Sequence, residues 1–373
     1  MTTLLSLGII VTVFSQVDAF ADVVRPMMYL FWAGFTLYMF LDVRKKGTLS
    51  RFSVYFGIVY VLFVAYCLGL TLFGYDHIQS HYLRVMPIAL LMSILGNLCA
   101  PFFSLENLRK LCYVYITMAL LFGVWVYFNF FGSYAEWLRS TIYLFDQKNS
   151  AAQIWSSAML LLLFIPKYHN KIYRFGGILI FLGFVYLLGM SQCRTAILAL
   201  LIVLVVWLYT QNKKYAIISA LGISLIAVLL WRWEVTRIFV EQSLLLNKYA
   251  GTDLNTFSSG RLVLYAEAWK TFLQHPFAGV GLYYVDNSYL SVLAESGVVG
   301  FVMIESIWVY KIMNNIKLAK QSRFSNLLYA WTCFYLVESI LEGLPPFGPG
   351  VSSFMFWFVT AVLYTNRQIR RNN

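Results

Sequence analysis

Long apolar runs separated by short polar segments dominate the chain. Residues 175–190, 195–209 and 215–231 are almost free of charge and approach the length that crosses a bilayer. A backbone in hydrocarbon must satisfy its own hydrogen bonds, so such runs are expected to be helices. The pattern predicts an all-α, polytopic helical bundle that forms a single membrane domain over residues 1–373. About twelve spans are expected, at residues 3–20, 26–42, 52–73, 85–100, 111–131, 151–166, 175–190, 195–210, 215–231, 290–310, 324–341 and 351–365.

The composition excludes an ordinary soluble domain. Hydrophobic residues make up 60% of the chain and charged residues only 12%, whereas soluble domains carry about 25% charged residues. The five cysteines and four histidines are dispersed, without the spacing of a metal site or a disulfide framework. No metal site, disulfide or cofactor is therefore expected.

The basic residues indicate how the chain is oriented. The net charge is +12, and 18 of the 28 basic residues fall in alternate loops and near the C-terminus. By the positive-inside rule these loops are cytoplasmic, as are both termini. No basic stripe with a nucleic-acid-binding motif is present, so the charge does not indicate a nucleic-acid partner.

The longest outer loop is expected at residues 232–289, between the ninth and tenth spans. Within it, apolar residues recur at helical spacing over about residues 260–275, with Ser259 as the expected N-cap and Pro276 after the end. An amphipathic helix of this kind is expected to lie along the membrane surface or against the mouth of the bundle.

Two outer arginines are candidate anion-binding residues. Arg261 falls in the first turn of the expected surface helix, where a bound phosphate is favourable and an unpaired cation is not. Arg194 ends the short turn SQCR between two apolar runs. Both arginines also fit a plainer role, in which they extend to the membrane interface or form surface salt bridges.

Acidic residues pose a similar choice. Asp286 begins the stretch DNSYLSVLAESG and fits two roles: N-cap of the next helix, or general base for an attacking hydroxyl. Glu295 either lines a polar cavity or anchors a neighbouring segment. Glu338 and Glu342, at the outer end of the eleventh span, leave the same alternatives open.

Several short motifs follow one another in a distinctive order. The turn S-x-x-R at 191–194 precedes S-G-R at 259–261, then H-P-F-x-G-x-G at 275–281, N-x-x-L at 287–290 and E-x-G at 295–297. This order resembles the O-antigen ligase and O-antigen polymerase superfamily of bacterial inner-membrane proteins. The resemblance is specific over about 191–300, and DQKNSAAQIW at 146–155 is similar to polymerases of the group.

The resemblance implies a donor glycan on a polyprenyl diphosphate at the periplasmic face. Arg194 and Arg261 match the arginines that hold the diphosphate. Ligases place a histidine directly before N-x-x-L as the proposed base, whereas this chain has Asp286, which favours a polymerase with Asp286 as the base. The expected substrate-binding residues are Lys148, Asn149, Asn287, Tyr289, Glu295 and Glu338.

The expected activity is therefore polymerisation of lipid-linked O-antigen repeat units by a metal-independent, inverting glycosyltransferase. The expected partners are the polyprenyl diphosphate-linked oligosaccharide, membrane lipid and a chain-length regulator protein. One alternative is an O-antigen ligase that transfers the glycan to lipid A–core. Another is a secondary transporter of lipid-linked sugar, although such proteins place their sites near the bilayer midplane, and the polar residues here gather at one outer face.

Overall fold

The structure is a computed structural model, which describes residues 1–42, 49–74, 77–131, 134–139, 148–164, 171–211, 213–246, 251–319, 323–348 and 351–372. All regular elements in these ranges are helical, which confirms the all-α fold. The long helices are α1 (Thr2–Phe14), α2 (Asp18–Asp42), α3 (Arg51–Leu72), α4 (His81–Cys99), α5 (Leu105–Phe130), α7 (Lys148–Phe164), α8 (Lys171–Met190), α9 (Arg194–Gln211), α10 (Lys213–Arg232), α15 (Ser288–Ala319), α16 (Arg323–Leu341) and α17 (Val351–Asn372). The short ones are η2 (Ala100–Phe102), α6 (Tyr134–Arg139), α11 (Glu234–Ser243), α13 (Leu254–Phe257) and α14 (Arg261–Gln274).

Four helices are long and apolar enough to cross a membrane: Arg51–Leu72, His81–Phe102, Leu105–Phe130 and Ser288–Lys317. Shorter apolar helices cover Thr2–Phe14, Arg174–Met190 and Arg194–Tyr209. Large apolar side chains are exposed along the outer faces of the bundle, which suits contact with lipid rather than water. The protein is thus a membrane protein. Several expected basic loop segments, such as residues 43–48 and 165–170, lie outside the described ranges.

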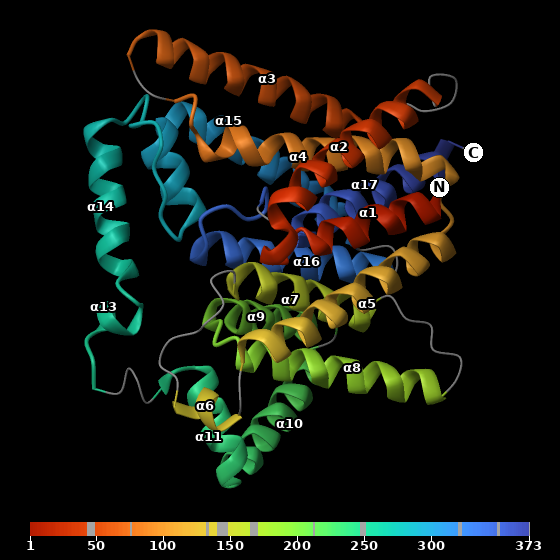
Figure 1. Ribbon diagram of the computed structural model, residues 1–373, viewed down its shortest axis with the longest axis vertical. Helices are drawn as coiled ribbons and strands as arrows, with labels where there is room; N and C mark the ends of the chain where they lie inside the picture. The colour runs from red at the N-terminus through yellow and green to blue at the C-terminus, as the bar shows by residue number, and fades with distance from the viewer. Residues whose placement is uncertain are drawn as a thin grey trace.

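The bundle has two distinct ends. In Figure 1 the N- and C-termini lie at the same edge, while α13 and α14 stand at the opposite edge. There α14 runs across the direction of the bundle helices and packs on α15. Its buried contact centres on Ala268, which packs with Val285 and Ala294. Inside the bundle, α17 lies along α4, and α16 contacts both α9 and α15.

Helix α15 is broken at Gly297, and the loop after α14 fits into the break. Gly297 has φ 63° and ψ −172°, a backbone conformation that favours glycine. The amides of Val280 and Gly281 donate to the carbonyls of Ala294 and Glu295 at 2.9 and 3.0 Å. The Val298 amide donates to the Pro276 carbonyl at 2.8 Å. The motifs H-P-F-x-G-x-G and E-x-G therefore form one interlock, which fixes the end of α14 against the bundle.

The start of α14 differs from the expected capping. Gly260, not Ser259, is the N-cap residue; it has φ 81° and no side-chain cap. The reason is that α13 ends only a few residues earlier, and the Gly260 amide donates back to the Asn255 carbonyl at 2.8 Å. Ser259 therefore belongs to the tight turn between the two helices, with φ 59°.

Candidate active site

Arg261 is the centre of a polar network at the α14 end of the bundle. Its Nη2 lies 2.9 Å from Oδ2 of Asp286 and 3.2 Å from Oε1 of Glu342. Its Nη1 donates to the Leu341 carbonyl at 2.7 Å. Asp286 lies two residues before the start of α15, and Glu342 directly follows α16. The Arg261 guanidinium thus connects the start of α14 with the segment before α15 and with the end of α16.

Glu342 extends this network to two further helices. Its Oε1 accepts a hydrogen bond from Thr195 Oγ1 at 3.2 Å, and its Oε2 accepts one from Asn149 Nδ2 at 3.0 Å. Thr195 lies in the first turn of α9 and Asn149 in the first turn of α7. The N-termini of four helices, α7, α9, α14 and α15, therefore meet here, which favours a bound anion. We call Arg261, Asp286, Glu342, Thr195 and Asn149 the Arg261 cluster.

Burial distinguishes the two carboxylates. The side chain of Asp286 is 31% exposed, whereas that of Glu342 is only 6% exposed. Burial raises the pKa of Glu342, and Asp286 adds to this rise while Arg261 opposes it. Burial also opposes the charge of Arg261, but Glu342 and Asp286 raise its pKa overall, so it remains a cation. Asp286 is the carboxylate that a substrate can reach.

The helix-cap role falls to Asn287 instead of Asp286. Asn287 Oδ1 accepts the Leu290 amide at 2.9 Å, as an N-cap does, and Nδ2 donates to the Ile340 carbonyl at 3.0 Å. The carboxylate of Asp286 faces Arg261, and its backbone carbonyl accepts from the Tyr265 hydroxyl. The cap interpretation of Asp286 is therefore wrong, and the residue has no such structural task at the start of α15.

Arg194 lies beside the Arg261 cluster but turns its guanidinium to another partner. Its Nη1 donates to the Phe257 carbonyl at 2.9 Å, and its Nη2 donates to Ser259 Oγ at 2.8 Å. The guanidinium also lies over the Phe257 ring, 5.4 Å from the centroid. Arg194 thus holds the turn that leads into Arg261, while the next residue, Thr195, contacts Glu342.

The remaining expected site residues divide between this cluster and the bundle interior. Lys148 begins α7 next to Asn149, although the first two residues of the DQKNSAAQIW motif lie outside the described ranges. Glu338 lies one turn before Glu342, and its Oε2 accepts from Gln153 Nε2 at 2.9 Å inside the bundle. The Tyr289 side chain turns inward to Trp308 and Ser339.

Glu295 forms a separate polar pair. Its Oε2 lies 3.2 Å from Nδ1 of His81, the first residue of α4, and its side chain is fully buried. The ring of His81 lies 5.5 Å from that of Tyr284, which also interacts with Asp286. Tyr284 therefore stands between the Glu295 pair and the Arg261 cluster. Burial and the charge of Asp286 raise the pKa of this phenol.

Glu342 is the main functional candidate outside the expected site. Its signal was present in the sequence, because Glu338 and Glu342 are four residues apart at the end of an apolar run and so share a helix face. Thr195 and His81 carried no comparable signal. Their partners are 147 and 214 residues away in the chain.

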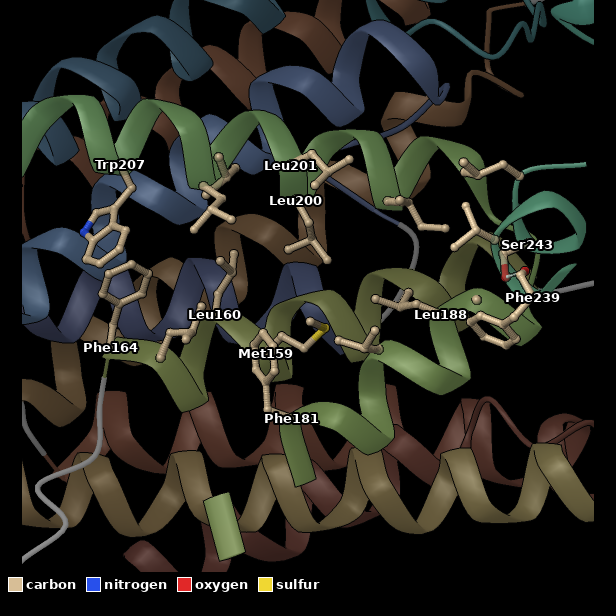
Figure 2. A pocket seen from close by; sticks show the side chains of 18 residues that line it. Met159, Leu160, Phe164, Phe181, Leu188, Leu200, Leu201, Trp207, Phe239 and Ser243 are labelled. Atoms are coloured by element: carbon tan, nitrogen blue, oxygen red, sulfur yellow. Dashed lines mark hydrogen bonds between the residues drawn. The ribbon is translucent and has the colours of Figure 1, made fainter. Parts of the chain in front are cut away.

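An apolar cavity of about 420 Å³ lies between α7, α8, α9 and α11. Figure 2 shows it extending from Phe164 and Trp207 at one end to Phe239 and Ser243 at the other. Its lining includes Leu188 and Gly189, which come shortly before the 191–194 turn that ends in Arg194. The lining suits a hydrocarbon chain and offers almost nothing to a polar headgroup.

Residues 178–304 match the sequence profile of a family described as O-antigen ligase. No curated protein matches the chain. The matched segment extends from α8 into α15 and contains Arg194, Arg261 and Asp286, whereas Asn149 and Glu342 lie outside it. The match confirms, over residues 178–304, the resemblance of this chain to the O-antigen ligase/polymerase superfamily.

Proposed function

We propose that the protein is an O-antigen polymerase. It transfers the growing glycan from its polyprenyl diphosphate carrier onto the next lipid-linked repeat unit. The observation that carries this proposal is the contact between Arg261 and the accessible carboxylate of Asp286, both of which lie in the family-matched segment, at a place where the N-termini of α7, α9, α14 and α15 meet. A cation for the leaving diphosphate and a base for the attacking hydroxyl are thus adjacent.

The proposed reaction needs few groups. A sugar hydroxyl of the acceptor attacks the anomeric carbon of the donor, and Asp286 accepts the hydroxyl proton. The bond from the anomeric carbon to the diphosphate oxygen breaks on the opposite side, so the configuration inverts. Arg261 and Arg194 stabilise the charge that grows on the leaving diphosphate. Since two arginines supply this stabilisation, the proposed transfer is metal-independent.

The cluster itself leaves room for this role. A guanidinium has five N–H donors, and the contacts of Arg261 occupy both hydrogens of Nη2 and one of Nη1. Among the described residues, no hydrogen bond of the Nε hydrogen or the second Nη1 hydrogen is seen, so both are offered to a phosphate oxygen. The polyprenyl chain of the donor would enter the apolar cavity, whose rim lies beside Arg194.

The proposed topology has about twelve spans, cytoplasmic termini and a periplasmic segment 232–289 in the bacterial inner membrane. Two observations support it. Both termini lie at the edge opposite α14 in Figure 1, and 18 of the 28 basic residues fall in alternate loops of the sequence and near the C-terminus. A chain-length regulator protein is the proposed partner, by analogy with polymerases of the superfamily.

The second candidate is an O-antigen ligase, because the matched family carries that description. In this case the acceptor would be lipid A–core. The residue before N-x-x-L argues against it, since Asp286 stands where ligases of the superfamily have histidine.

One reconstitution separates these candidates. Purified protein in liposomes, with EDTA, receives a polyprenyl diphosphate-linked repeat unit as its only substrate. A ladder of lipid-linked oligomers is expected. Transfer that occurs only after addition of lipid A–core would identify a ligase instead. Absence of both products from a folded sample would reject the glycosyltransferase proposal.

A further inference from the structure

A second cavity, rich in arginine, lies behind the Arg261 cluster. It has a volume of about 360 Å³ and receives Arg25 from α2 and Arg84 from α4. Hydroxyl and amide side chains complete its polar wall, and none of the described residues that line it is acidic. The polar members of the lining other than the arginines are Thr12, Ser15, Gln16, Tyr29 and Ser150. We call this space the arginine cavity.

The arginine cavity shares a wall with the Arg261 cluster. On α7, Asn149 binds Glu342, and the next residue, Ser150, lines the arginine cavity. The segment after α16 also contributes to both sites. It starts at Glu342, which belongs to the Arg261 cluster, and its residues Phe347 and Gly348 line the arginine cavity. Consecutive Cα atoms are only about 3.8 Å apart, so Asn149 and Ser150 place the two sites next to each other at the start of α7.

The charge of the arginine cavity is not balanced. Nε of Arg25 donates to the Ser15 carbonyl at 3.3 Å, which holds this guanidinium at the wall and leaves its Nη groups for another partner. Arg84 is exposed. Among the described residues, neither arginine has a carboxylate within 4.0 Å, whereas Arg261 contacts two. Two arginine forks in one cavity suit the oxygens of a phosphate or diphosphate.

Polymerisation supplies a ligand with this chemistry. Both substrates carry a lipid diphosphate, but only the donor loses its own. The acceptor attacks with a hydroxyl at the far end of its oligosaccharide, so its intact diphosphate must lie away from Asp286 and on the same side of the membrane. We propose that the arginine cavity binds the diphosphate of the acceptor lipid. This inference rests on the proposed polymerase activity and concerns residues outside the family-matched segment.

A pair of acceptors tests the assignment. One carries the repeat-unit oligosaccharide on polyprenyl diphosphate, and the other carries the same oligosaccharide on a neutral lipid. The donor has a blocked non-reducing end, so that it donates but cannot accept. Since a charge-assisted hydrogen bond contributes about 1.5–3 kcal/mol, wild type should show a KM roughly tenfold or more lower for the diphosphate acceptor.

Arg84→Gln should remove this preference by raising the KM for the diphosphate acceptor roughly tenfold, with the neutral acceptor unchanged. Arg25→Gln should act in the same direction. Arg232→Gln is the matched control, because Arg232 is exposed at the end of α10 and does not line the cavity; it should retain the preference. Equal loss with both acceptors in Arg84→Gln, or no loss, would overturn the assignment.

A binding measurement separates this inference from the proposed activity. Polyprenyl diphosphate without sugar is titrated into the solubilised protein, and the bound lipid is counted. Two molecules per chain are expected for wild type and one for the Arg25→Gln/Arg84→Gln variant. If phosphatidylglycerol displaces the second molecule at equal concentration, the cavity takes bulk phospholipid headgroups and the acceptor assignment fails. Two bound molecules without any ladder would contradict the polymerase proposal but leave the lipid-phosphate site standing.

Discussion

Asp286 and Asn287 are neighbours with separate tasks at the start of α15. Asn287 satisfies the helix N-terminus through the Leu290 amide, while Asp286 meets Arg261 with a partly exposed carboxylate. Because the cap is supplied by the next residue, removing the charge of Asp286 tests its chemistry without removing the cap.

Asp286→Asn should therefore fold normally and lose activity. A general base contributes about 10²–10⁴-fold to rate, so we expect at least about a 100-fold slower ladder in the reconstituted assay. Thermal unfolding of the same sample checks that the fold is intact. Glu267→Gln, at an exposed position of α14, is the control. Full activity of the Asp286 variant would exclude it as the base.

Glu342 should give the protein a distinctive dependence of stability on pH. Its pKa is raised in the folded state, mainly by burial. Folding therefore favours the protonated carboxyl, so this contribution to stability is present at low pH and lost as pH rises through the raised pKa. The Glu342→Gln variant has no carboxyl group to titrate at this position, so it does not lose this stability as pH rises. Its Tm should gain on that of wild type as pH rises above about 4.5, the ordinary pKa of a glutamate.

Parallel Tm curves for wild type and Glu342→Gln would show that Glu342 does not titrate in this range. Glu136→Gln, in the short helix α6, supplies a comparison at a carboxylate outside the Arg261 cluster. Its curve should follow that of wild type.

At the residue scale, the sequence was sufficient for Arg261 and Asp286 but not for the whole cluster. Helix position and motif order singled out these two residues. Glu342 could not be paired with Arg261, because nothing local indicates that the end of α16 lies beside the start of α14. Arg194 was expected to bind diphosphate. The sequence did not indicate that it also contacts Phe257 and Ser259 and so holds the turn before Arg261.

At the scale of elements, the interlock between α15 and residues 276–281 determines where α14 ends. A Cβ added at Gly297 would lie 2.3 Å from the Phe277 carbonyl oxygen, and one added at Gly279 would lie 2.4 Å from the Glu295 carbonyl oxygen. The two backbones thus approach as closely as glycine allows. The sequence did not indicate this contact, because it joins residues about 18 apart in the chain, beyond the reach of local turn rules.

Gly297→Ala should consequently destabilise the fold. The residue combines a positive φ with a backbone clash, and a strained conformation of this kind costs about 1–3 kcal/mol before the clash is counted. Thermal unfolding in detergent should show a Tm several degrees lower. Gly222→Ala in α10 has open space and no positive φ, and alanine favours a helix over glycine by about 0.5–1 kcal/mol, so its Tm should be unchanged or slightly higher. Equal Tm values for the two variants would contradict the interlock.

At the scale of the molecule, the apolar pattern predicted the helices well. The expected spans overlap long helices within the described ranges, because uninterrupted apolar stretches in lipid have no alternative to helix. The way the helices pack against one another could not be predicted from the apolar pattern. Contacts of α17 with α4, or of α16 with α9, depend on side-chain shapes that hydropathy does not encode. Within the described residues, four helices meet the length and hydropathy criteria for a span, and three further apolar helices are shorter.

The proposed topology can be tested by labelling introduced cysteines in spheroplasts. Glu267→Cys on α14 should react with a membrane-impermeant thiol reagent, whereas Lys317→Cys near the other end of α15 should react only with a permeant one. Both positions are exposed, and four of the five native cysteines are buried, so background labelling should be low. Labelling of Lys317→Cys alone by the impermeant reagent would reverse the orientation.

The two carboxylates that contact Arg261 affect which lipid headgroups can bind this arginine. Anionic phospholipids greatly outnumber lipid-linked sugars in a bacterial membrane, and a bare arginine at the interface would be occupied by them most of the time. Here an arriving headgroup competes with Asp286 and Glu342 for the guanidinium. A singly charged phosphodiester is a weak competitor for that position, whereas a diphosphate brings more charge and a second set of oxygens. If Arg261 binds the lipid diphosphate as proposed, Asp286 and Glu342 therefore make this arginine selective for a diphosphate over the more abundant, singly charged phospholipids.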